Sequence, residues 1–191
     1  MSDAIDLIHR DHVNMNKVLA VMGDIVDGLE TAAEPERDLD LLTSVVYYIR
    51  LYPDRCHHPK EEKYLFKALG PRKAEARDLI KQLERQHIEG SKRIDAVDAA
   101  LKDYDRTRGD LAPLRQAVHD YIAFQRDHMD LEESRLLPLA REALPNDDWG
   151  AITLAFAGDA DPMFSENLET GFRVLFDRIT RHHGGAGHAV H

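Results

Sequence analysis

Residues 54–66 read DRCHHPKEEKYLF, and the interpretation of the whole chain depends on this stretch. Two adjacent histidines stand one helical turn before two adjacent glutamates, with Pro59 between the pairs and an apolar run after them. Residues four apart share one face of a helix, so His57 and Glu61 are predicted to point the same way. The stretch is either a charged, solvated patch of helix or a set of metal ligands.

The chain around this stretch has the three-and-four spacing of apolar residues that is typical of amphipathic helices. The predicted long helices span about residues 3–34, 35–70, 72–104 and 110–144, and shorter helices are predicted at about 146–158 and 162–182. Proline removes a backbone donor and crowds the preceding turn, so a kink or short break is expected between Pro53 and Pro59. No segment shows the alternation that is typical of a strand.

Four long helices joined by short links predict an all-α fold, an up-down-up-down four-helix bundle over residues 1–144. Residues 145–182 are predicted to form a helical extension packed on this bundle. The glycine-rich tail, residues 183–191, is expected to be flexible.

Composition narrows the class of protein. The 191 residues are 43% hydrophobic, which suits one domain with a sizeable core. The formal net charge of −10 argues against nucleic acid and anionic membrane surfaces as partners. A single cysteine, Cys56, allows no intrachain disulfide, and neither a secretion signal nor a membrane span is recognised. We therefore expect a cytoplasmic monomer or homodimer.

Histidines stand where apolar residues are expected. The chain has 11 of them, and His12, His87 and His128 each occupy an apolar stripe. With antiparallel helices rising 1.5 Å per residue, these three and His57 lie roughly 14 to 23 Å from one end of the bundle. A single core histidine is usually neutral and hydrogen-bonded, but four helices that each present one at a common depth favour a shared site.

Two glutamates accompany these histidines at the same depth. Glu132 follows His128 by four residues, as Glu61 follows His57. An isolated buried carboxylate is costly, and no lysine or arginine falls on the central stripes at this depth. Two divalent cations about 3.5–4 Å apart would satisfy both carboxylates, and nitrogen and oxygen donors suit iron, manganese or zinc. Glu62 and Glu133 are expected to be solvated.

These motifs, in this order, resemble the hemerythrin-like (HHE cation-binding) family over roughly residues 1–144. The resemblance implies a four-helix bundle that holds a non-haem di-iron centre, with Glu61 and Glu132 as bridges. The ligands that it implies are His12, His57, Glu61, His87, His128 and Glu132.

The chain departs from the pattern of the oxygen-carrying members in two places. Those proteins have a second histidine one turn after the third-helix histidine, where this chain has Ser91. Their last motif places an acid five residues after its histidine, whereas Glu132 follows His128 by four. Both departures argue against simple reversible oxygen carriage. His58 is a candidate for the missing ligand; the alternative is a surface histidine beside the kink.

The preferred function is binding of O2, NO or peroxide at an open iron position, for sensing, scavenging or stress response. One alternative is a di-iron enzyme with peroxidase-like, catalase-like or ferroxidase activity, and another is a metal-responsive regulatory module. Because the ligands must be neutral imidazoles, metal affinity is expected to fall as pH drops through about 6 to 6.5.

Overall fold

The computed structural model describes residues 4–158, 161–164 and 172–184, the last three of these by their backbone only. The described residues form helices joined by turns and contain no strand, which confirms the predicted all-α class. No helix among them is both long enough and apolar enough to cross a membrane.

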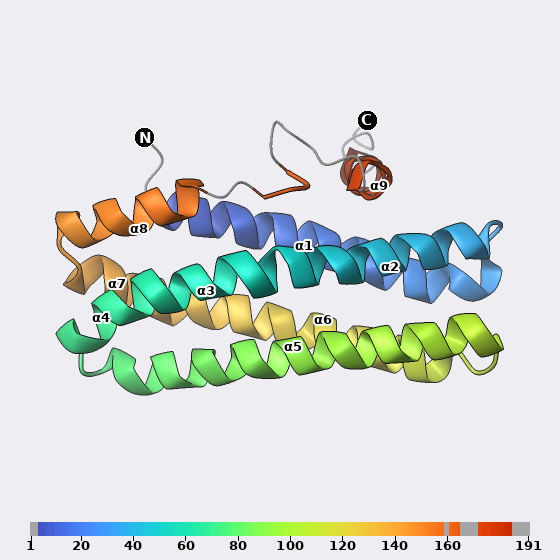
Figure 1. Cartoon of the computed structure of the whole chain (residues 1–191), viewed down its shortest axis with the longest axis horizontal. Helices are drawn as coiled ribbons and strands as arrows, with labels where there is room; N and C mark the ends of the chain where they lie inside the picture. Colours follow the sequence, from blue (N-terminus) through green and yellow to red (C-terminus); the bar gives the residue numbers. More distant parts are fainter. Residues whose placement is uncertain (1–3, 159–160, 165–171, 185–191) are drawn as a thin grey trace, which may run out of the picture.

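Four long rods lie side by side and run alternately in opposite directions (Figure 1). The first is α1 (Ala4–Gly28), which ends in a short 3-10 turn (Leu29–Thr31). The second begins with α2 (Pro35–Leu51) and continues through α3 (His58–Lys60) to α4 (Lys67–Arg72). The third and fourth rods comprise α5 (Ala76–Thr107), α6 (Ala112–Leu131) and α7 (Leu137–Ala143).

The second and fourth rods contain wide π-helical turns. Pro53–His57 and Glu61–Phe66 lie in the second rod, and Glu132–Leu136 lies in the fourth. At Pro53–His57 the amide of His57 donates to the carbonyl of Tyr52, five residues back, at 3.0 Å. Of the kink or short break expected between Pro53 and Pro59, the break is wrong, because the chain stays helical and accommodates Pro53 in a wider π-turn. Such turns are frequent at functional sites.

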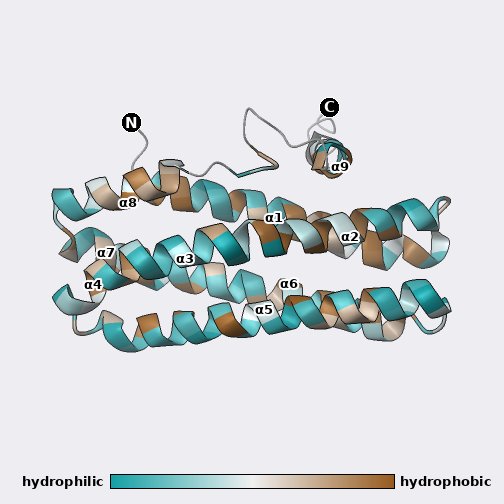
Figure 2. Cartoon of the chain, in the orientation of Figure 1, coloured by the Kyte–Doolittle hydropathy of each residue, from teal (hydrophilic) through white to brown (hydrophobic). Residues whose placement is uncertain are grey.

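The apolar core is divided into two clusters along the bundle axis. On α1 the first cluster uses residues 4–8 and the second uses residues 15–26. On α5 the corresponding residues are 76–83 and 94–101. Each helix buries its apolar stripe, as amphipathic helices do, and Figure 2 shows hydrophobic and hydrophilic residues mixed along every rod. The two clusters leave a polar level between them, and that level carries the histidines.

The C-terminal part of the chain contacts the bundle through two helices. Helix α8 (Asn146–Gly158) packs on α1 and buries Ile152 and Phe156, while α9 (Arg173–Gly184) contacts α1 and α2. The helix predicted over 162–182 is wrong at its start, because residues 162–164 form a turn. Of the tail predicted to be flexible, residues 185–191 lie outside the described residues.

Candidate metal centre

All seven side chains that were predicted as metal ligands are buried at one level of the bundle. They come from all four rods, and each retains 7% exposure or less. The three π-turns contribute or border several of them. The seven are His12, His57, His58, Glu61, His87, His128 and Glu132.

These side chains form three overlapping groups, in each of which one donor atom per residue lies within 4.8 Å of the others. One group combines Glu61, His87, His128 and Glu132. The remaining groups are His58 with His87 and His128, and His12 with His57 and Glu61. His12 also reaches the second glutamate, with Nε2 3.3 Å from Glu132 Oε2. Glu61 and Glu132 therefore lie between two sets of imidazoles.

Several donor atoms at the centre of this cluster have no hydrogen-bond partner among the described residues. The atoms without one are His57 Nε2, His87 Nε2, His128 Nε2, Glu61 Oε2, Glu132 Oε1 and Glu132 Oε2. His57 Nε2 is 3.2 Å from Glu61 Oε1, which is an ion-pair distance. Buried polar groups are normally paired. Imidazole nitrogens and carboxylate oxygens that converge in this way fit a cation that takes nitrogen and oxygen donors.

The opposite ring nitrogen of four cluster histidines is fixed by a residue from the neighbouring rod. His57 Nδ1 lies 3.1 Å from Asp11 Oδ2, and His87 Nδ1 lies 2.8 Å from Glu62 Oε1. A ring whose Nδ1–H donates to an acceptor presents the lone pair of Nε2 to a metal.

Two further contacts of this kind, each between a histidine Nδ1 and an anchoring residue on the neighbouring rod, complete a closed circuit around the bundle. His128 Nδ1 lies 3.2 Å from Gln86 Oε1, and His12 Nδ1 lies 2.9 Å from Glu133 Oε1. Together the four contacts join the first rod to the second, the second to the third, the third to the fourth, and the fourth to the first. Each rod thus supplies one residue that contacts the histidine of one adjacent rod, and its own histidine is contacted by a residue from the other adjacent rod.

This outer circuit of contacts was not predicted from the sequence. Glu62 and Glu133 were expected only to be solvated, but each anchors a cluster histidine while 44% and 35% of its side chain remains exposed. Asp11 and Gln86 were not considered. The signal in the sequence is adjacency, since every anchor is the immediate neighbour of a cluster residue. Lys60, also missed, is buried with Nζ 5.7 Å from the centre of the Phe156 ring on α8.

His58 is buried, so it is not a surface histidine. Its ring stacks on that of His87 with 4.2 Å between centroids, and its Nδ1 lies 3.7 Å from Asp54 Oδ1. Ser91, at the position where the oxygen carriers have a further histidine, contacts Asp54 instead. His9 is largely exposed and reaches only the outer anchor, Glu133.

The cluster shifts the ionisation of its own members. Burial lowers the pKa of His12, but contacts with Glu132 and Glu133 outweigh burial and raise the pKa to about 9. His87 behaves likewise, and contacts with Glu132 and Glu61 raise its pKa to about 10. Burial and neighbouring imidazoles hold the pKa of His58 well below its usual value. In the absence of a cation, protons shared among the imidazoles neutralise the two glutamates.

A small cavity of about 20 Å³ adjoins the cluster, which is room for a molecule of about the size of water. Tyr48 and Tyr52 line this cavity, whereas Tyr121 does not. The lining residues are Asp11, His12, Met15, Tyr48, Tyr52, Pro53, His57, His58, Gln125, His128 and Met129. The Phe156 ring of α8 meets His57 edge-on at 5.6 Å.

Comparisons with known proteins agree with this geometry. A family model described as the hemerythrin HHE cation binding domain matches residues 3–140. Searches of curated proteins and of solved structures returned no match.

Proposed function

Since the chain belongs to the hemerythrin HHE cation-binding domain family, we propose that its buried cluster holds two iron ions. His58, His87 and His128 would bind one ion, and His12 and His57 would bind the other. Glu61 and Glu132 would bridge the two. The observation that supports this most is the convergence of nitrogen and oxygen atoms without hydrogen-bond partners between the four rods.

The donor set favours iron among the candidate metals, with manganese or zinc as alternatives. Five imidazoles and two carboxylates form the set, and the single thiol, Cys56, belongs to none of the groups. Nitrogen and oxygen ligands of this kind suit iron, manganese and zinc, whereas thiolates select softer sites. The ranking of iron above the others follows from the family.

The two ions would not be equally coordinated. An ion bound by His12 and His57 would have one imidazole fewer than an ion bound by the other three histidines, which would leave room for an external ligand. Residues on this side, including Asp11, Met15 and Tyr52, also line the small cavity. The cavity has room for a molecule of about the size of water, which favours a small ligand such as O2, NO or peroxide.

We therefore propose that the protein binds a diatomic or peroxide ligand, in sensing, scavenging or stress response. A bound iron pair would supply reversible electron transfer and Lewis acidity. The chain's own residues fix the imidazole tautomers through Asp11, Gln86, Glu62 and Glu133, and they exclude bulk water from the cluster.

A Met15→Phe substitution tests the route of the external ligand. The larger ring is expected to occupy the cavity and weaken NO or azide binding at least ten-fold, as measured by optical titration of the iron-loaded protein. The iron content should stay at the wild-type value, because Met15 is not among the proposed ligands. Val13→Phe, at an exposed position of the same helix, serves as the control. Unchanged affinity in Met15→Phe would place the external ligand elsewhere.

A His58→Ala substitution tests the assignment of the seventh ligand. Wild-type protein loaded with ferrous iron is expected to contain two ions per chain, and the variant should retain about one after gel filtration. His119→Ala is the control, because His119 is exposed and pairs only with Asp27. Two tightly held ions in His58→Ala, with an unaltered optical spectrum, would remove His58 from the ligand set.

A further inference from the structure

Two tyrosines lie between the cavity and the C-terminal segment. Tyr48 and Tyr52 are buried on consecutive turns of the second rod, and both line the cavity beside the cluster. Their rings stack with 6.2 Å between centroids and 24° between planes. This separation is short enough for an electron to move between the two rings.

Each hydroxyl donates to a buried carboxylate. Tyr52 donates to Asp11 Oδ2 at 2.9 Å, and Tyr48 donates to Asp161 Oδ2 at 2.8 Å. Asp11 Oδ2 also accepts from Nδ1 of the proposed ligand His57 at 3.1 Å. A continuous series of contacts therefore leads from the cluster through Asp11 and Tyr52 to Tyr48.

Packing alone does not account for these pairs. Phenylalanine rings would fill the same volume without requiring buried acids beside them, and burying carboxylates is costly. Asp161 does have a second role, since it accepts the backbone amides of Met163 and Phe164. The fully buried Tyr121 on α6, which does not line the cavity, pairs instead with the amide of Gln125 at 2.8 Å. A carboxylate partner is thus a feature of the two tyrosines next to the cavity.

We propose that Tyr52 and Tyr48 donate single electrons to the oxidised metal centre and hold the oxidising equivalent as a tyrosyl radical. This inference rests on the proposed function. The oxidant is hydrogen peroxide, which takes up two protons from solvent and two electrons, supplied one at a time through the tyrosines, to give two water molecules. When Tyr48 gives up one electron, its phenolic O–H bond breaks and the proton passes to Asp161, to which the hydroxyl already donates. Tyr52 stacks on Tyr48 nearer the cluster and passes the electrons inward, and reduction of Tyr48 returns its proton before the second electron leaves.

The environment of both phenols suits coupled loss of an electron and a proton. Burial and the charge of Asp161 raise the pKa of Tyr48 well above its usual value, and burial and Asp11 raise that of Tyr52. Both side chains are therefore neutral at physiological pH. A phenol that loses an electron becomes strongly acidic, so a base within hydrogen-bond distance is required. Asp161 meets that requirement for Tyr48 without any movement.

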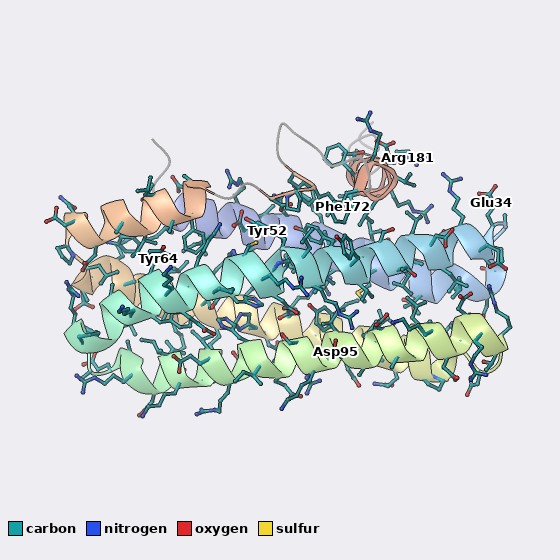
Figure 3. All side chains as sticks on the ribbon, viewed as in Figure 1. Glu34, Tyr52, Tyr64, Asp95, Phe172 and Arg181 are labelled. Atoms are coloured by element: carbon teal, nitrogen blue, oxygen red, sulfur yellow. The ribbon has the colours of Figure 1, made fainter. Side chains whose placement is uncertain are left out.

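Two further aromatic rings connect Tyr48 to the protein surface. Phe172 meets Tyr48 edge-on at 5.7 Å, and Tyr47 stacks on the other side of Phe172 at 5.7 Å. Tyr47 is 59% exposed. Figure 3 shows Tyr52 and Phe172 on the side of the bundle that faces α9. A reductant in solution can therefore reach the outer end of the series, which would restore the tyrosines.

The test is to mix iron-loaded protein with hydrogen peroxide, freeze the mixture within milliseconds to seconds, and record electron paramagnetic resonance spectra. Wild type is expected to give an organic radical with the hyperfine pattern of tyrosine. The variant with both Tyr48→Phe and Tyr52→Phe should lose at least nine-tenths of that signal. Tyr121→Phe is the matched control and should keep it. Asp161→Asn retains both rings but lacks the base, so its radical yield should fall several-fold.

Iron content, far-ultraviolet circular dichroism and the optical change on adding peroxide are measured on every variant. If the wild type takes up no iron, or if neither NO nor peroxide changes the optical spectrum of the iron-loaded protein, the proposed function fails and this inference fails with it. If NO changes the spectrum and peroxide does not, this inference alone is overturned. If the centre is oxidised equally in all variants and the radical is absent, or persists in the double variant, this inference alone is overturned. A radical that maps to Trp149 or Tyr47 in wild type would also overturn it.

Discussion

The Glu61→Ala variant is expected to retain fewer than one metal ion per chain under conditions in which the wild type retains two. Glu61 belongs to the groups on both sides of the cluster, so its loss removes a ligand from each proposed ion. It also leaves His57 and His87 without the carboxylate that their Nε2 atoms face, at 3.2 and 3.5 Å. Metal analysis after desalting measures the effect directly.

Two further variants separate loss of a ligand from loss of the fold. Glu61→Gln keeps the shape of the side chain, and it should fold as the wild type does while still failing to bridge two ions. Glu84→Ala removes an exposed glutamate from α5 and should retain both ions. If Glu61→Gln and Glu61→Ala both hold two ions with wild-type affinity, the bridged di-metal assignment is wrong.

The second large effect is a difference in how pH changes the stability of metal-free and metal-loaded protein. In the metal-free protein the pKa of His12 is raised to about 9 and that of His87 to about 10, above the unfolded value near 6.5. The stability that these protonated rings contribute is complete below pH 6.5 and is lost as pH rises through 9 and 10. Each additional proton bound by the folded state gives a slope of about 1.4 kcal/mol per pH unit.

At the acidic end the glutamates determine the profile of the metal-free protein. Opposing effects of burial and of imidazole neighbours leave the pKa of Glu132 lowered to about 2. Its contribution is therefore present above the unfolded value near 4.5 and is lost as pH falls towards 2. The metal-free protein should be most stable between about pH 4.5 and 6.5.

The metal-loaded protein should respond differently, because its imidazoles are neutral in the folded state at every pH at which metal stays bound. Above pH 7 the unfolded imidazoles are neutral too, so stability should be nearly constant up to pH 9.5 and should fall below pH 6.5. Urea unfolding between pH 5 and 9.5, with chelator or with excess metal, measures both profiles. Parallel profiles would contradict histidine ligation.

The raised pKa values of His12 and His87 also change the pH range predicted from the sequence for metal binding. Metal affinity was expected to fall only below about pH 6 to 6.5, the range of an ordinary histidine. Because His12 and His87 hold their protons up to about pH 9 and 10, protons compete with the metal through the whole neutral range. Affinity measured at pH 7 should therefore be well below its value at pH 9.

The pairing of ligands within one helix was predictable from the sequence, and the anchoring between helices was not. Spacings of four residues placed His57 with Glu61 and His128 with Glu132 on common faces, because a helix repeats every 3.6 residues whatever surrounds it. The contact between Asp11 and His57 depends instead on the relative height and rotation of two rods. A shift of one residue, about 1.5 Å and 100°, would break it.

The sequence by itself determined that this chain is helical and that each long helix carries a histidine among its apolar residues, since both follow from local spacing. Only the tertiary structure decided that His58 turns inward, that the helices stay continuous through π-turns, and that four outer residues hold four rings in a circuit. It also decided that Tyr48 and Tyr52 donate hydrogen bonds to carboxylates from distant segments of the chain. The physical reason is that such contacts join residues 25 to 121 positions apart, whose distances are set by packing of whole helices.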